Sequence, residues 1–125
     1  MAYIFVTVGT TNFDGLIREV DSDSFVKWSA SHGYSGGILI QRGNGTYVPK
    51  SPVIRAYDFK PSLASDMAGA ALVVSHAGSG SIIESLGLGK KTVVVVNTAL
   101  MHNHQIELAS KLAELGRVEL SNGPP

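Results

Sequence analysis

The spacing of apolar residues along the chain predicts short strands that alternate with helices. Runs of apolar and β-branched residues mark the strands, and the runs around Val73 and Val94 have no polar alternation, which is typical of strands covered on both faces of a parallel sheet. The predicted strands are Tyr3–Val8, Gly37–Gln41, Val53–Tyr57, Leu72–Val74, Val93–Val96 and Val118–Leu120.

Helical spacing appears between these runs. Phe13, Leu16, Ile17 and Val20 lie at i, i+3, i+4 and i+7 and predict an amphipathic helix, with Thr11 or Asn12 as its cap. A short helix is predicted through Phe25, Val26 and Trp28, with Ser22 or Asp23 as its cap and His32-Gly33 at its end. A third helix is predicted to start at Pro61 and to run through Ala68. Two more are predicted over Ser81–Leu88, where Ile82, Ile83 and Leu86 lie at helical spacing, and over Asn103–Leu115 before Gly116.

This order predicts an α/β domain over residues 1–120, in which a Rossmann-like, mainly parallel sheet carries helices on both faces. Residues 121–125 read as a frayed or truncated tail. Right-handed crossovers place every loop that follows a strand at one edge of the sheet. We therefore expect four polar, glycine-rich loops to converge there, namely Gly9–Thr11, Gln41–Gly45, His76–Ser81 and Asn97–Gln105.

Composition excludes several classes of function. The 125 residues carry 10 Lys and Arg against 10 Asp and Glu, and no basic cluster appears, so nucleic acid is not expected as a partner. The absence of cysteine removes disulfides and thiolate metal sites and fits a reducing compartment. We also expect neither a signal peptide nor a transmembrane helix.

The segment His76–Ser81 lies where a buried strand ends and a helix begins. Gly78 and Gly80, with Ser79 and Ser81 beside them, favour a nest of backbone N–H groups that binds phosphate at a helix N-terminus, although a plain tight turn is the alternative. The dinucleotide fingerprint is not met, because Ile83 stands at the position of its third glycine. The P-loop motif is not met at Gly89-Lys90 either, because Glu84 stands where the first glycine of that motif should be.

Two further groups of residues are candidates for ligand binding. Glu84, one turn into the helix, is either a solvated carboxylate favoured by the helix dipole or an acceptor for ribose hydroxyls. Asn103, His104 and Gln105 either begin a helix or recognise hydroxyl and acetamido groups. The chain offers no convincing metal site, because its histidines lack ligand spacing and Asp21-Ser22-Asp23 is better interpreted as a helix cap.

Three segments resemble a known family. They are VTVGTTNFD, QRGNGTYVP and SHAGSGSIIESLGLGKKTVVVVNTALMHNHQIELASKLAELG. Together they cover nearly the whole chain, and they resemble the soluble donor-binding subunits of the eukaryotic UDP-N-acetylglucosamine transferases of dolichol-linked oligosaccharide synthesis, in the glycosyltransferase family 28 C-terminal domain. The chain is similar, more distantly, to the C-terminal half of the bacterial transferase that adds GlcNAc to the peptidoglycan lipid precursor.

The resemblance implies the donor half of a GT-B glycosyltransferase, and it assigns roles to the candidate residues. It places the diphosphate of UDP-GlcNAc on Gly78, Ser79, Gly80 and Ser81 with His76 close by, and the ribose on Glu84. It places the GlcNAc near Asn103, His104 and Gln105, and it makes Gly9, Thr10 and Thr11 a first glycine loop that faces the cleft. His102 stands where relatives more often carry Asn or Asp.

The resemblance also implies an inverting transfer that adds the second GlcNAc to GlcNAc-diphosphodolichol without a cofactor. No acceptor site or catalytic base is visible in the chain, apart from His76 as a possible catalytic group. We therefore expect a membrane-anchored partner subunit that binds the lipid-linked acceptor, supplies the base and recruits this cytoplasmic chain to the cytosolic face of the endoplasmic reticulum. The alternatives are a non-catalytic nucleotide-sugar-binding or assembly module and, less favoured, an NAD-dependent oxidoreductase.

Overall fold

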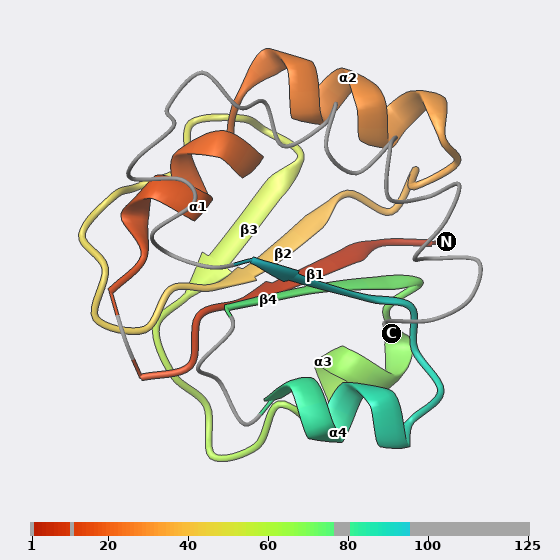
Figure 1. The fold of residues 1–125 in the computed structure, drawn as a ribbon. Coiled ribbons are helices and arrows are strands. Elements are labelled where there is room, and N and C mark those ends of the chain that lie inside the picture. The colour runs from red at the N-terminus through yellow and green to blue at the C-terminus, as the bar shows by residue number, and fades with distance from the viewer. Residues whose placement is uncertain (1, 11, 77–80, 96–125) are drawn as a thin grey trace.

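The computed structural model describes residues 2–10, 12–76 and 81–95. In this part of the chain a sheet of five strands forms the middle layer (Figure 1). The strands are β1 (Ile4–Thr7), β2 (Ile38–Gln41), β3 (Ile54–Tyr57), β4 (Leu72–His76) and β5 (Thr92–Val95). The strands predicted over the same part of the sequence are confirmed, with β4 running two residues further than the pattern indicated.

The strand order is β3-β2-β1-β4-β5, and every pairing among these strands is parallel. The chain starts in the centre, moves out to β3, and returns to the other side of β1. In the register Thr7 stands opposite both Gln41 and Ser75, so that the strand ends lie side by side. All five strands therefore present their carboxyl ends at one edge of the sheet, as expected.

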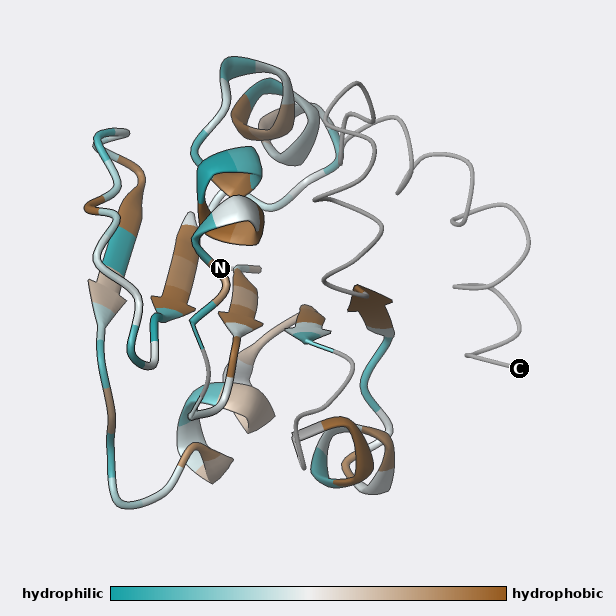
Figure 2. Cartoon of the chain, turned by 60° about the vertical axis from the view of Figure 1, so that its left-hand side comes forward, coloured by the Kyte–Doolittle hydropathy of each residue, from teal (hydrophilic) through white to brown (hydrophobic). Residues whose placement is uncertain are grey.

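Helices cover both faces of the sheet (Figure 1). The helices α1 (Asp14–Val20) and α2 (Asp23–Ser31) lie on one face, and α3 (Ala64–Gly69) and α4 (Ser81–Gly87) lie on the other. This two-sided cover explains the continuous apolar runs of the central strands, which appear brown in Figure 2, because both faces of those strands are shielded from water. β3, at the edge, has a more mixed sequence and is half-buried or exposed along its length.

Two hydrophobic clusters fill the space between the sheet and its helices. The larger one joins Leu16, Ile17 and Phe25 of α1 and α2 to the upper face of the strands, and all three side chains are fully buried. The smaller one packs Met67 of α3 against Phe5 and its neighbours on the opposite face. Burying such side chains contributes about 1.5–3 kcal/mol each, so the helices hold their places mainly through these faces.

The N-cap of α1 is Phe13, without a side-chain cap, and not the predicted Thr11 or Asn12, although the Asn12 side chain accepts the Asp14 N–H at 3.2 Å. Two other helix ends follow the expected chemistry. The hydroxyl of Ser22 accepts the Phe25 N–H at 3.2 Å and caps α2, as predicted. At the end of α4, Lys90 N donates to Ser85 O and Gly89 N donates to Leu86 O, with Gly89 at φ +73°. This is a Schellman motif with glycine at the left-handed position.

Two further local predictions were wrong, the start of α3 and the inward face of α4. Pro61 is not in the first turn of α3, because that helix begins at Ala64. The Ser62 hydroxyl accepts the Ala64 N–H at 3.1 Å. On α4, Ile83 is 79% exposed and Leu86 is 44% exposed, although their spacing indicated an inward face. The reason is that α4 turns Ser85 toward the sheet, where its hydroxyl forms a buried 2.6 Å hydrogen bond with Thr92.

The predicted helix over Asn103–Leu115, the predicted strand Val118–Leu120 and the tail 121–125 lie outside the described residues. The proposed division of the chain at residue 120 therefore stays a prediction. Within the described residues, none of the helices combines the length and the hydropathy that crossing a membrane requires.

Candidate functional site

The carboxyl edge of the sheet gathers the predicted loops that the structure describes. Gly9 and Thr10 follow β1, Gln41 closes β2, and His76 closes β4 beside them. Asn44 donates from its side-chain amide to Thr10 O at 2.8 Å, which joins the second loop to the first. The predicted convergence is confirmed for these loops.

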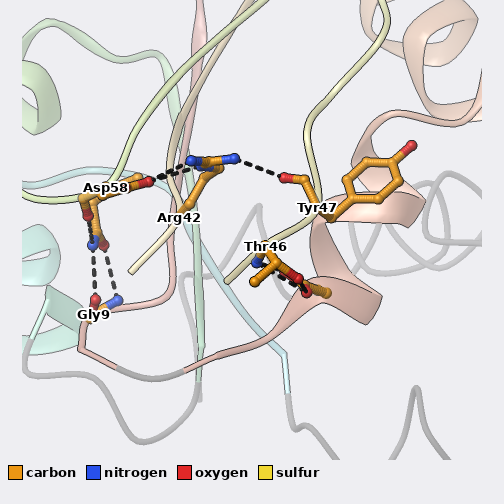
Figure 3. A network of polar contacts seen from close by, with 7 residues as sticks. Gly9, Arg42, Thr46, Tyr47 and Asp58 are labelled. Carbon is orange, nitrogen blue, oxygen red and sulfur yellow. Dashed lines mark hydrogen bonds and ion pairs between the residues drawn. The ribbon is translucent and has the colours of Figure 1, made fainter. Parts of the chain in front are cut away.

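Gln41 is the centre of the polar contacts at this edge. Its side chain is buried, with 2% exposed, and its Oε1 accepts the Thr7 hydroxyl at 2.6 Å and the Gly9 N–H at 2.9 Å. Its Nε2 donates to Gly9 O and to Asp58 O, each at 2.7 Å. The ends of β1, β2 and β3 are therefore tied together through one side chain, and both polar backbone atoms of Gly9 are occupied (Figure 3).

Arg42 extends this network toward the next loop. Its Nη2 lies 2.7 Å from Asp58 Oδ1, and its Nε donates to the same oxygen at 2.9 Å. Its Nη1 donates to Tyr47 O at 3.0 Å (Figure 3). The guanidinium is thus used to hold Asp58 and Tyr47 in place, and an ion pair this exposed contributes at most about 1 kcal/mol.

Asp14 fixes the same loop to α1. Both of its carboxylate oxygens accept the Thr46 N–H at 3.2 Å, and Oδ2 also accepts the Thr46 hydroxyl at 3.2 Å. Partial burial acts to raise the pKa of Asp14, but the hydrogen bonds from Thr46 and from the Tyr47 backbone outweigh it, so the pKa is lowered. Asp14 is therefore an ionised anchor for the segment 42–53, which joins β2 to β3 without a helix.

The run Asp21-Ser22-Asp23 was predicted to cap a helix, and its middle residue does so, but Asp21 has a separate role that the sequence did not predict. Ser22 is the cap, while Asp21 accepts hydrogen bonds from the Tyr47 hydroxyl at 2.5 Å and from the N–H groups of Lys50 and Ser51, each at 2.9 Å. Burial acts to raise the pKa of Asp21, and these hydrogen bonds outweigh it and lower the pKa. The carboxylate thus fixes the far end of the segment 42–53.

His76 is half-buried at the end of β4, next to the first glycine loop. Its ring meets the ring of Phe13 edge to face, with centroids 5.2 Å apart and planes at 79°. Phe13 is 2% exposed and belongs to the larger core cluster. The imidazole is therefore oriented by the core while it stands at the edge where the loops gather.

The remaining predicted residues are only partly described. Ser81 opens α4, and Glu84 lies in the first turn of that helix and is exposed. Thr11, Gly78, Ser79, Gly80, Asn103, His104 and Gln105 lie outside the described residues. The described edge thus brings Gly9, Thr10 and His76 together.

Sequence reasoning placed Gln41 in a converging loop but missed its role. The available signal was a carboxamide directly after the apolar run Ile38–Ile40, at a position where a parallel strand ends. A polar side chain that is buried at such a point must satisfy its hydrogen bonds with nearby backbone. The partners themselves, 17 to 34 residues away, carry no sequence signal.

Comparisons with known proteins agree with this fold. The model of the glycosyltransferase family 28 C-terminal domain matches residues 3–120. The chain is 47% identical over 123 residues to the UDP-N-acetylglucosamine transferase subunit ALG13 of Mus musculus, which covers 94% of this chain and 10% of that protein. It is 40% identical to the subunit of the same name from Yarrowia lipolytica, over 90% of this chain and 60% of that protein. The chain therefore spans less than two thirds of the length of these curated relatives.

Solved structures give the same result. The NMR solution structure of ALG13 superposes with a TM-score of 0.63 at 30% identity, covering 92% of this chain and 75% of that one. The glycotransferase of kitacinnamycin has a TM-score of 0.52 at 18% identity, over 75% of this chain and 24% of that one. This likeness supports the fold alone. The architecture is consistent with the predicted Rossmann-like C-terminal half of a GT-B glycosyltransferase. Sequence, structure and family model together place this chain in the glycosyltransferase family 28 C-terminal domain family.

Proposed function

We propose that this chain is the UDP-GlcNAc-binding subunit of a two-chain N-acetylglucosaminyltransferase. The enzyme would add the second GlcNAc to GlcNAc-diphosphodolichol with inversion at the anomeric carbon. The observation that carries this proposal is the match of the family model to residues 3–120, together with 40–47% identity to proteins named UDP-N-acetylglucosamine transferase subunit.

The donor would lie at the carboxyl edge of the sheet. Its diphosphate would bind the turn Gly78–Ser81, between His76 at the end of β4 and the first turn of α4. A helix N-terminus offers free N–H groups and the positive end of the dipole, which suit a diphosphate. Exposed Glu84 would accept the ribose hydroxyls, and Asn103, His104 and Gln105 would recognise the GlcNAc.

The chemistry divides between two chains in this proposal. Transfer to a hydroxyl requires a base at the acceptor and stabilisation of the departing diphosphate. The turn before α4 would supply the stabilisation, with the oriented imidazole of His76 beside it. The relatives are named subunits, which supports a partner chain; that partner would bind the lipid-linked acceptor, supply the base, anchor the enzyme and recruit this chain to the cytosolic face of the endoplasmic reticulum.

Reconstitution of transfer tests this proposal. We expect the purified chain alone to transfer almost no GlcNAc from UDP-GlcNAc to GlcNAc-diphosphodolichol, and addition of membranes that contain the partner to restore transfer. A non-catalytic binding module would bind UDP-GlcNAc but never restore transfer. Full turnover by the chain alone would contradict the two-chain proposal.

A pair of variants tests the donor site itself. Glu84→Ala should raise the KM for UDP-GlcNAc in the reconstituted enzyme about tenfold, since the loss of a charged hydrogen-bond acceptor costs roughly 1.4 kcal/mol or more. Glu19→Ala is the matched control, because Glu19 lies on α1, which covers the other face of the sheet. Equal effects of the two substitutions on KM would refute the assignment of Glu84.

A further inference from the structure

The side chain of Gln41 uses every hydrogen-bonding position that a carboxamide offers. Its oxygen accepts from Thr7 and Gly9, and its nitrogen donates to the carbonyls of Gly9 and Asp58. These four contacts also fix which way the amide points, because a flipped amide would face two donors with its NH₂ group and two carbonyls with its oxygen.

Only glutamine meets these demands at this position. Glutamate lacks the two donors, asparagine is shorter by one methylene group, and an apolar residue would leave the Thr7 hydroxyl without the buried acceptor that it now has. Both polar backbone atoms of Gly9 depend on the same amide. The side chain therefore does more than fill space at the end of β2.

The effect of these contacts is to set the path of the chain as it leaves β1. Gly9 is held at φ +69°, a left-handed conformation, with its N–H and its carbonyl both bound to Gln41. The next residue is held as well, because Asn44 donates to Thr10 O at 2.8 Å. The Gly9 N–H is consequently committed to the protein, and ligand contacts from this loop must come from the residues that follow it.

We propose that Gln41 is a positioning residue for donor binding, which acts by holding the Gly9–Thr10 turn in the conformation that meets the nucleotide sugar; Asn44 assists it. This inference rests on the proposed function, because it concerns the same edge of the sheet. The amide of Gln41 has no hydrogen-bonding position left for the nucleotide sugar, because all four are used within the protein. It transmits its effect through the backbone of Gly9, and it joins the ends of β1, β2 and β3 in doing so.

The test compares Gln41→Glu with Ser29→Ala in the full chain. Gln41→Glu keeps the size of the side chain but replaces both donors with an oxygen that faces two carbonyls. Ser29→Ala is the control, because it removes the 2.8 Å hydrogen bond that the buried Ser29 hydroxyl donates to Val26 O within α2, a helix that carries none of the proposed donor contacts. Each variant is titrated with UDP-GlcNAc while the amide resonances of Gly9 and Thr10 are followed by NMR.

Gln41→Glu should shift the Gly9 and Thr10 resonances and weaken UDP-GlcNAc binding about tenfold, whereas Ser29→Ala should change neither. Lowering the pH from 8 to 5.5 should protonate part of the introduced carboxyl, return one donor and recover part of the affinity relative to the wild-type chain at the same pH, which has the same Arg42, Asp58 and His76 at this edge. Asp14 and Asp21 have lowered pKa values, so the anchors of the segment 42–53 stay ionised over this range.

Exposed Asn44 provides a second variant that does not endanger folding. Asn44→Ala should shift the resonances after Thr10 and weaken binding a few-fold. Unchanged affinity in both Gln41→Glu and Asn44→Ala, or an equal loss in Ser29→Ala, would overturn the positioning role while the proposed function stands. Failure of the wild-type chain to bind UDP-GlcNAc would instead contradict the proposed function, and the role of Gln41 in donor binding with it.

Discussion

Replacement of Asp21 tests how the segment 42–53 is held against the helices. Its carboxylate accepts three hydrogen bonds, from the Tyr47 hydroxyl and from the N–H groups of Lys50 and Ser51. A hydrogen bond to a charged group contributes about 1.5–3 kcal/mol when water cannot replace it. The Lys50 N–H is exposed and can bind water instead, so the loss of stability comes from the contacts with the Tyr47 hydroxyl and the Ser51 N–H.

Asp21→Ala should therefore lower the free energy of unfolding by about 3 kcal/mol. Asp21→Asn keeps an acceptor oxygen but loses the charge, and should cost about half as much. Asp23→Ala is the matched control, because Asp23 is exposed in the first turn of α2 and should contribute only about 0.5 kcal/mol through the helix dipole. Urea unfolding at pH 7, followed by the fluorescence of Trp28, measures all three.

The same carboxylate makes a prediction about pH. Because the pKa of Asp21 is lowered from its ordinary value of 3.8, its stabilisation is complete above that value and is lost as pH falls through the folded-state pKa. The difference in stability between wild type and Asp21→Asn should thus stay constant from pH 7 to about 5 and shrink below about 4. The reasoning is refuted if Asp21→Ala costs no more than Asp23→Ala, or if the difference grows in acid.

Two further predictions concern the other face of the sheet. Gly89→Ala should lower the free energy of unfolding by about 1–2 kcal/mol because Gly89 has φ +73°, whereas Gly87→Ala, in α4 with open space around it, should raise it by up to about 1 kcal/mol. Thermal unfolding of both variants distinguishes the backbone effect from a packing effect, and a loss of stability in both would contradict the backbone effect. Tyr57→Phe removes the 2.6 Å hydrogen bond to Asp66 and should cost about 1.5 kcal/mol. Burial and that hydrogen bond raise the pKa of Tyr57 above its ordinary 10.0, so the stabilisation by its hydroxyl is complete below pH 10 and is lost as pH rises further. Unfolding measured between pH 9 and 11 should show wild type losing stability faster than Tyr57→Phe, and parallel curves would refute this pH dependence.

The sequence predicted the framework well because the physics of a parallel sheet is local and repetitive. Central strands such as β1 and β4 are apolar on both sides, and the handedness of their crossovers brings their loops to one edge. The capping of α2 by Ser22 was predictable for the same reason, since donor and acceptor lie within one turn.

The contacts that sequence reasoning missed join residues far apart along the chain. Asp21 stands in a run that resembles a helix cap, and only the fold reveals that Lys50 and Ser51 supply its partners. Likewise, nothing in the spacing of Ile83 and Leu86 shows that α4 turns a serine toward the sheet. Rotation of a helix about its own axis is decided by packing, which periodicity alone does not settle.

The most direct test of the central claim is an NMR titration of the labelled chain with UDP-GlcNAc, with UDP-glucose and NADH as controls. The account predicts shifts at Gly9, Thr10, His76 and Glu84 and in the predicted contacts Gly78–Ser81 and Asn103–Gln105, strongest for UDP-GlcNAc. Shifts confined to other faces of the domain, or an equal response to NADH, would contradict a nucleotide-sugar site at the carboxyl edge of this sheet.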